Sequence, residues 1–231
     1  MAKLLQQFKP GSIGRLDLLD HGKPGGVYRL LATAPSAPFP LDSRPAFQDT
    51  REPMDPSLRL VSQKQVYKGR MLEVTVDRVE LPNHREVDLE IIRHPGAAAV
   101  VPVDAQGRVV LVRQVRYATG GWLVEIPAGK LGGDEAPEAC AARELAEEAG
   151  LAAGKLTPMG CIWTTPGFTD ERIWLFLATE LTEVRQALEA DEVLTIQRMP
   201  LAEAIEKAQR GEIDDAKSVC ALLRVPRFLR Q

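Results

Sequence analysis

The stretch GKLGGDEAPEACAARELAEEAGL, residues 129 to 151, carries the strongest structural signal in the chain. Pro137 suits the first turn of a helix, and the two acidic residues shortly before it would lie at the positive end of the helix dipole. Gly150 supplies the left-handed residue that commonly follows a last helical turn. The stretch therefore predicts a helix over residues 136 to 149.

Three glutamates fall on one face of this predicted helix. Glu144 lies four residues before Glu148 and three before Glu147, and side chains at these spacings are neighbours on a helix surface. Like charges at such spacings destabilise a helix, and Arg143 offers the local counter-charge. A divalent cation supplies the missing positive charge, because Mg²⁺ binds a few carboxylates together with phosphate and water. The glutamate face predicts a metal site, and a solvated acidic face is the alternative.

The same stretch resembles the Nudix box, and the likeness to Nudix hydrolases extends from about residue 57 to residue 225. The residues that match the fixed positions of the box are Gly129, Glu135, Arg143, Glu144, Leu145, Glu147, Glu148, Gly150 and Leu151. This resemblance implies a metal-dependent hydrolase with an α+β fold, a Nudix-type α/β/α sandwich with a mixed sheet. The succession of strand-like runs and few helices also favours this class over a doubly wound sheet.

The segments on either side of the box resemble those of ADP-ribose pyrophosphatases. Residues 112 to 117 (VRQVRY) and 125 to 129 (EIPAG) are similar to the segments that precede the box there, and Pro166 occupies the place of that subfamily's marker proline. The resemblance implies hydrolysis of ADP-ribose, a nucleotide sugar, to AMP and ribose 5-phosphate. The alternatives are another substrate, such as a GDP-sugar or a dinucleoside polyphosphate, and a nonenzymatic nucleotide sensor.

The resemblance also implies roles for single residues. Glu144 and Glu148, with the carbonyl oxygen of Ala128, are expected to hold two or more Mg²⁺ or Mn²⁺ ions across the pyrophosphate. Glu147 is expected to be a further ligand or to position water, and bound metal would polarise a phosphoryl oxygen and acidify that water. Glu171, on a downstream loop, is the expected general base, with a solvated loop carboxylate as the alternative.

Substrate contacts are expected from strands that flank the box. Arg116 and Arg113 are expected to pair with phosphate or ribose oxygens, because a guanidinium group binds such oxygens through paired hydrogen bonds. Glu125 is expected to accept a hydrogen bond from the ribose or the adenine. The sequence does not decide which aromatic residue stacks on the adenine. The candidates, each of which could instead be a core residue, are Tyr67, Tyr117 and Trp163.

Composition limits the partners and the compartment. The chain has 231 residues, a formal net charge of -3 and a pI of about 5.7, so we expect no nucleic-acid partner. Cys140, Cys161 and Cys220 are odd in number and widely spaced, which argues against a disulfide framework and favours a reducing, cytoplasmic setting. The first residues lack the apolar length of a signal peptide, and no stretch is long enough to cross a bilayer. We therefore expect no membrane partner.

Changes in composition and hydrophobic pattern along the chain predict three segments. Residues 1 to 56 read as a proline- and glycine-rich extension, residues 57 to 94 as a small antiparallel β subdomain, and residues 95 to 231 as the Nudix hydrolase domain. Residues 72–81 and 87–93 are expected to form a hairpin. The other expected elements are a hairpin over 97–103 and 108–112, strands at 122–126, 160–164, 172–178 and 192–198, and helices over 201–210 and after Asp214.

The first hairpin is too small to be stable alone and must pack on something. Enzymes that this chain resembles use the same segment to form a homodimer in which one subunit helps to build the other's substrate pocket. The resemblance thus implies a two-fold homodimer, the commonest closed assembly, with Arg78 or Arg85 reaching substrate across the interface. The extension before residue 57 is expected to add little to the dimer or to catalysis.

Overall fold

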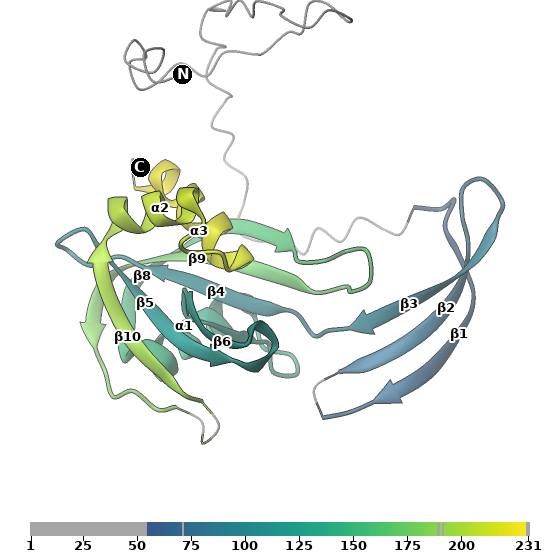
Figure 1. The fold of residues 1–231 in the computed structure, drawn as a ribbon, viewed down its shortest axis with the longest axis horizontal. Helices are drawn as coiled ribbons and strands as arrows, with labels where there is room; N and C mark the ends of the chain where they lie inside the picture. The colour runs from purple at the N-terminus through teal and green to yellow at the C-terminus, as the bar shows by residue number, and fades with distance from the viewer. Residues whose placement is uncertain (1–54, 71, 189, 191, 230–231) are drawn as a thin grey trace, which may run out of the picture. The chain divides into compact units, whose positions relative to one another are not determined.

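The computed structural model describes residues 55–70, 72–188, 190 and 192–229, and these residues form three β-sheets, three α-helices and one short 3₁₀ helix (Figure 1). The predicted extension lies almost wholly outside the described residues. The segment boundaries at residues 57 and 95 stay predictions.

A four-stranded mixed sheet forms the centre of the fold. Its strand order is β7 (Ala128–Lys130), β4 (Ala97–Pro102), β9 (Arg172–Glu183) and β8 (Leu151–Trp163). The β4–β9 pair is parallel, whereas the β4–β7 and β8–β9 pairs are antiparallel. Every residue of β4 is buried, because this strand of small and β-branched residues has a neighbour on each edge and is covered on both faces.

A second, antiparallel sheet has the order β10 (Leu194–Pro200), β5 (Arg108–Arg116) and β6 (Gly121–Glu125). The predicted hairpin of residues 97–103 with 108–112 is wrong in its pairing. Beyond an isolated bridge between Val103 and Val109, β4 and β5 belong to different sheets. The edges of β4 are already taken by β7 and β9, so β5 pairs elsewhere and closes the sandwich.

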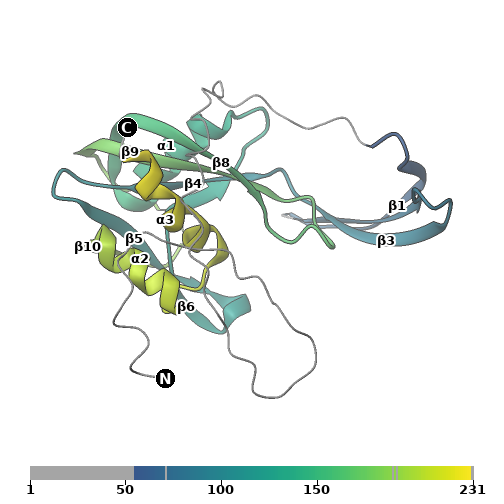
Figure 2. The same cartoon turned by 90° about the horizontal axis from the view of Figure 1, so that it is seen from above.

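Helices cover both faces of the central sheet. Helix α1 (Pro137–Ala149) packs over a core cluster that contains Val100, Leu145 and Phe176. Helices α2 (Leu201–Arg210) and α3 (Ala216–Phe228) pack over a second cluster on the other side. Figures 1 and 2 show α1 and the α2–α3 pair on opposite sides of the sheets. This arrangement confirms the predicted α+β sandwich.

The third sheet contains β1 (Arg59–Lys68), β2 (Glu73–Glu80) and β3 (Glu86–Arg93), with antiparallel pairs in the order β1-β2-β3. The β2–β3 pair is the hairpin expected from the sequence. Residues at the end of β3 bond to the loop before β9: Ile92 donates its backbone N–H to Phe168, and His94 donates its own to Asp170 Oδ1 at 2.8 Å. The chain enters β4 shortly after these bonds.

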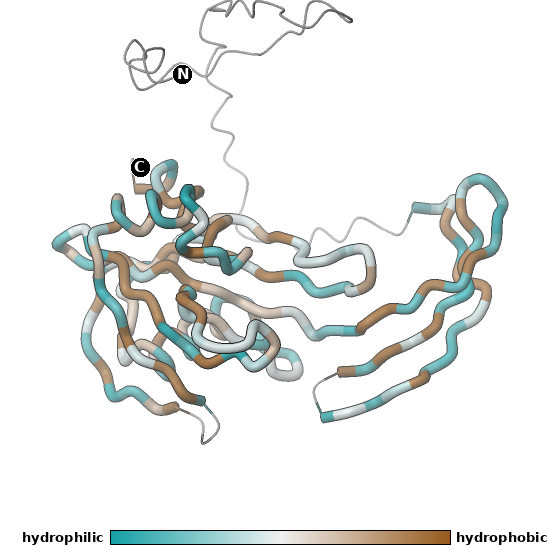
Figure 3. Tube along the Cα trace, in the orientation of Figure 1, coloured by the Kyte–Doolittle hydropathy of each residue, from teal (hydrophilic) through white to brown (hydrophobic). Residues whose placement is uncertain are grey.

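Hydropathy follows this architecture. Figure 3 shows hydrophobic residues along the central strands and a mixed pattern on the β1-β2-β3 sheet. Within the part of the chain that the structure describes, no helix has both the length and the apolar character needed to cross a membrane. The short 3₁₀ helix η2 (Tyr117–Thr119) joins β5 to β6.

Candidate active site

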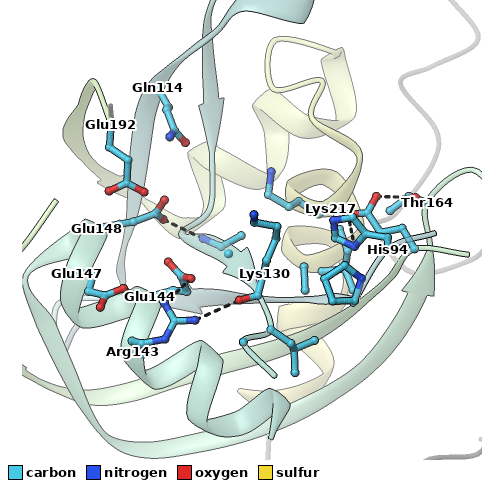
Figure 4. Close-up of a pocket in the computed structure, with 18 of the residues that line it drawn as sticks. His94, Gln114, Lys130, Arg143, Glu144, Glu147, Glu148, Thr164, Glu192 and Lys217 are labelled. Carbon is cyan, nitrogen blue, oxygen red and sulfur yellow. Dashed lines mark hydrogen bonds and ion pairs between the residues drawn. The ribbon is translucent and has the colours of Figure 1, made fainter. Parts of the chain in front are cut away.

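A cavity of about 1280 Å³ lies where β7, α1 and the first turn of α3 meet. Carboxylates gather at one end of it, and His94 and Thr164 lie at the other (Figure 4). The carboxylates at the acidic end belong to Glu144, Glu147, Glu148 and Glu192.

Helix α1 presses two of these carboxylates against strand β7. Glu148 Oε2 accepts a hydrogen bond from the backbone N–H of Ala128 at 2.9 Å. The Glu144 side chain lies directly over Gly129, where an added β-carbon would be 1.8 Å from Glu144 Oε1. Both glutamates are buried, with 7% and 2% of their surface exposed for Glu144 and Glu148. Their spacing of four residues puts them on the same side of the helix.

Arg143 ties the rest of the acidic motif together. Its guanidinium donates to Glu144 Oε1 at 2.7 Å and to Glu147 Oε2 at 2.9 Å. It also donates to both oxygens of Glu135, at 2.8 and 2.9 Å, and to the backbone oxygen of Lys130. Hydrogen bonding from Arg143 lowers the pKa of Glu135 to about 2. Arg143 lines the cavity, and its donors are engaged by carboxylates and backbone.

The two buried carboxylates carry more negative charge than their surroundings neutralise. Burial, with smaller contributions from Glu144 and Glu192, raises the pKa of Glu148 to about 8 despite the hydrogen bond from Ala128. Burial also raises the pKa of Glu144, where Arg143 opposes the shift and Glu147 and Glu192 add to it. A bound cation would stabilise both ionised carboxylates.

This donor set fits a hard divalent cation. The oxygens are carboxylates with an electrostatic deficit, and Ala128, the expected carbonyl ligand, also lines the cavity. Among the described residues, no three His, Cys, Asp or Glu side chains are placed so that they could hold a metal ion by themselves. Such a partial set suits Mg²⁺, which binds proteins through one or two carboxylates and keeps water and substrate phosphate as its other ligands.

A charge network around the buried Glu125 contributes two cations to the cavity wall. Arg116 binds Glu125 through two hydrogen bonds, from Nε to Oε1 at 2.8 Å and from Nη2 to Oε2 at 3.0 Å. Lys217 donates to the same Oε2. Arg116 and Lys217 line the cavity, whereas Glu125, only 1% exposed, stands behind them. Sequence reasoning singled out Arg116 and Glu125 but missed Lys217, although the segment around it, GEIDDAK, resembles the subfamily's C-terminal stretch.

Three other predicted substrate-binding residues lie outside this cavity within the single chain. Arg113 stacks on the Trp122 ring, 4.5 Å from its centroid. Arg78 pairs with Asp88 on the neighbouring strand, at 2.7 Å. Arg85 is exposed in the segment between β2 and β3. The structure thus brings Arg116 to the box glutamates and does not bring these three arginines there.

Glu171, Glu192 and Asp215 lie outside the box and line the same cavity. Glu171 Oε2 accepts a hydrogen bond from Thr164 Oγ1 at 2.9 Å, and Glu171 Oε1 lies 3.6 Å from His94 Nδ1. Glu192, on the segment before β10, comes close enough to Glu144 and Glu148 to raise the pKa of both. Figure 4 shows Glu192 beside Glu148. Glu192 was missed from the sequence because it belongs to no motif.

The aromatic candidates for adenine stacking lie on exposed surface. Tyr67, Tyr117 and Trp163 are 59%, 98% and 51% exposed, and none of them lines the cavity. Trp163 stacks on the guanidinium of Arg172, which lies 5.1 Å from the ring centroid. The single chain provides no aromatic wall from these three residues.

The sandwich fold and the glutamate helix held against β7 agree with the family that the sequence matches. The family model of the NUDIX domain matches residues 93–222, and the chain belongs to this family of hydrolases.

Known relatives agree with this assignment. The chain is 39% identical to the ADP-ribose pyrophosphatase of Bacillus subtilis, over 71% of this chain and 90% of that one. It is 37% identical to the methanol dehydrogenase activator of Bacillus methanolicus, over the same shares of the two chains. The solved structure of an ADP compounds hydrolase matches with a TM-score of 0.66 and 23% identity, over 75% of this chain and 94% of that chain. The last likeness concerns the fold.

Proposed function

We propose that this Nudix hydrolase cleaves the pyrophosphate bond of ADP-ribose and releases AMP and ribose 5-phosphate. The observation that carries the proposal is a single cavity lined by four carboxylates at one end and also by the cations Arg116 and Lys217. Such a cavity suits an anionic diphosphate between a metal site and fixed positive charge. The similarity to the Bacillus subtilis enzyme supports ADP-ribose among nucleoside diphosphate derivatives.

In this mechanism, Glu144 and Glu148, with the carbonyl oxygen of Ala128, would hold two or more Mg²⁺ or Mn²⁺ ions. The metal would polarise a phosphoryl oxygen and acidify the attacking water. Arg143 orients Glu144 and Glu147 through its hydrogen bonds, and Glu147 is the further ligand or positions the water.

Hydrolysis forms a bond from the water oxygen to phosphorus and breaks the bond from phosphorus to the bridging oxygen. The water proton needs an acceptor within hydrogen-bond reach. The sequence favours Glu171, which already accepts a hydrogen bond from Thr164. Glu192 is the stronger candidate in the folded chain, because it lies close to the box glutamates. We propose Glu192 as the main proton acceptor, with Glu171 as its competitor.

A substrate panel tests the proposed function. With Mg²⁺ present, we expect ADP-ribose to be preferred over GDP-mannose and diadenosine polyphosphates by about tenfold or more in kcat/KM, which corresponds to about 1.4 kcal/mol. Chromatography should identify AMP and ribose 5-phosphate as the products. A reversed preference would assign the enzyme to another Nudix substrate, and the absence of turnover with every member would favour a nucleotide sensor.

The assembly is proposed to be a two-fold homodimer built on the β1-β2-β3 sheet. Strand β1 is exposed along its whole length, and large apolar side chains stand out on this sheet, including Leu60, Val66, Tyr67 and Leu89. Exposed apolar groups gathered in this way are typical of a protein interface. Arg78 and Arg85, which lie outside their own chain's cavity, would then serve the partner's substrate.

Truncation tests this assembly. A chain that begins at Ser57 should remain dimeric and active, whereas a chain that begins at His94 should lose both properties, because it lacks the proposed interface. Light scattering and ADP-ribose turnover provide the measurements, and circular dichroism checks the fold. Val66→Glu, a surface change on β1, should weaken the dimer in the full-length chain. Loss of activity or dimerisation in the Ser57 truncation would make residues before 57 a working part of the enzyme.

We also propose a cytoplasmic location. Cys140, Cys161 and Cys220 are all free thiols in the fold, which suits a reducing compartment. Cys140 is buried, and burial raises the pKa of its thiol to about 12, so it behaves as a small core residue.

A further inference from the structure

Lys217 occupies a position that helix electrostatics disfavour. It is the second residue of α3, where the unpaired backbone N–H groups give the helix its positive end. A cation there is unfavourable unless nearby charges compensate. Two carboxylates do so: Glu125 Oε2 accepts a hydrogen bond from Lys217 Nζ, and Asp215 Oδ1 lies 3.1 Å from the same atom. The helix itself gains nothing from this lysine, so its role is to be found in what the lysine faces.

Glu125 fixes two cations with one carboxylate. Its Oε1 binds Arg116, and its Oε2 binds both Arg116 and Lys217. Burial alone would raise the pKa of Glu125, but hydrogen bonds and charge from Arg116 and Lys217 outweigh burial and hold that pKa below its usual value. Glu125 therefore stays ionised and fixes the positions of both cations from behind the cavity wall.

Both cations keep donors for a ligand. A lysine ammonium has three N–H donors, and Lys217 has two carboxylate partners among the described residues. A guanidinium has five donors, and Arg116 uses two of them on Glu125. Both side chains line the cavity, whereas Glu125 does not. Figure 4 shows Lys217 and Lys130 in the middle of the cavity, between the acidic end and His94.

We propose that Lys217, positioned by Glu125, binds a phosphate oxygen of the substrate diphosphate and forms a clamp with Arg116 in the cavity that the box glutamates also line. This inference rests on the proposed function in taking a nucleoside diphosphate derivative as the substrate. It assigns the third Lys217 donor to the ligand and explains why a cation stands at the positive end of α3. Glu125 is a positioning residue in this clamp.

Steady-state kinetics on the full chain test the proposal. Lys217→Met removes the charge and keeps the length of the side chain, so we expect KM to rise about tenfold or more while kcat changes by less than about threefold, the pattern of lost ground-state binding. Lys217→Arg should recover most of the affinity, because a guanidinium also donates to phosphate. Lys155→Met, an exposed lysine on β8 outside the cavity, is the matched control and should leave KM unchanged.

A double-mutant cycle tests the role of Glu125. Glu125→Gln should itself raise KM, and Lys217→Met should add little in that background, because the positioning interaction is already lost. If Lys217→Met lowers the melting temperature and leaves KM unchanged, Lys217 serves only to balance the charge of Glu125, and the proposal is overturned. The melting temperature and KM of Lys217→Met can be measured even if the Glu125 variant fails to fold.

The test is separable from the substrate assignment. If the wild-type enzyme prefers another nucleoside diphosphate derivative, the proposed function fails, and the same Lys217 variants measured with that substrate still decide the clamp. If no substrate is turned over, calorimetric binding of ADP-ribose to the wild type and to Lys217→Met decides it by the same criterion of about tenfold.

Discussion

Replacing Glu148 by glutamine is expected to lower kcat by about a hundredfold or more, because several kcal/mol of transition-state stabilisation depend on a metal ligand's charge. Glu148 is buried and hydrogen-bonded to Ala128, and glutamine preserves its shape. Turnover of ADP-ribose with saturating Mg²⁺ is the measurement. Normal activity in E148Q would contradict the metal assignment.

The melting temperature of the same variant, measured without metal at several pH values, shows whether the variant is folded. In the metal-free folded protein the pKa of Glu148 is raised to about 8 from 4.5. The folded state then holds more protons than the unfolded state between these values, so the Glu148 contribution to stability falls as pH rises from about 4.5 to about 8 and is level above that. Without metal, E148Q should melt above the wild type at pH 9 and approach it near pH 4.5.

Removal of the proposed general base is expected to have the second large effect. We expect Glu192→Gln to lower kcat by about a hundredfold and to change KM little, because a proton acceptor acts mainly in the transition state. Glu171→Gln should have a smaller effect on kcat, since Glu171 is engaged by the Thr164 hydroxyl. Glu203→Gln, on the exposed face of α2, is the control.

Comparison of the two variants decides between the candidates. A larger loss of kcat in Glu171→Gln would restore the assignment made from the sequence and would leave Glu192 as a purely electrostatic neighbour of the box. Unchanged kcat in both variants would move the role to Glu147, which also lines the cavity.

Local signals in the sequence predicted the helices well. The predicted helix over 136 to 149 and the helix over 201 to 210 match α1 and α2 closely, because capping residues and apolar spacing are local properties. Strand β1 was missed. Its residues are all exposed, so no alternation of buried and exposed positions marks it, and its strand form depends on pairing with β2.

The site residues also differ in whether local sequence signals or tertiary packing bring them together. Glu144, Glu147 and Glu148 share one helix, so their spacing alone puts them together. Lys217 and Glu192 reach the cavity only through the packing of α3 and the path of the chain before β10. No spacing rule connects residues so far apart in the chain. Glu192 belongs to no motif, and the likeness of the GEIDDAK segment to the subfamily's C-terminal stretch does not by itself put Lys217 in the cavity. Tertiary structure had to supply these two.

The contact between Glu144 and Gly129 suggests why glycine stands at the first position of the box, and the reason differs from the usual one, a left-handed backbone conformation. Gly129 is not among the glycines with positive φ, so its backbone conformation is open to any amino acid. A side chain there would displace the Glu144 carboxylate, because an added β-carbon would lie 1.8 Å from its Oε1. The motif glycine therefore leaves room for the Glu144 carboxylate against strand β7. The surface beneath the Glu144 carboxylate is the main chain of Gly129, so substitutions of neighbouring side chains leave this surface in place.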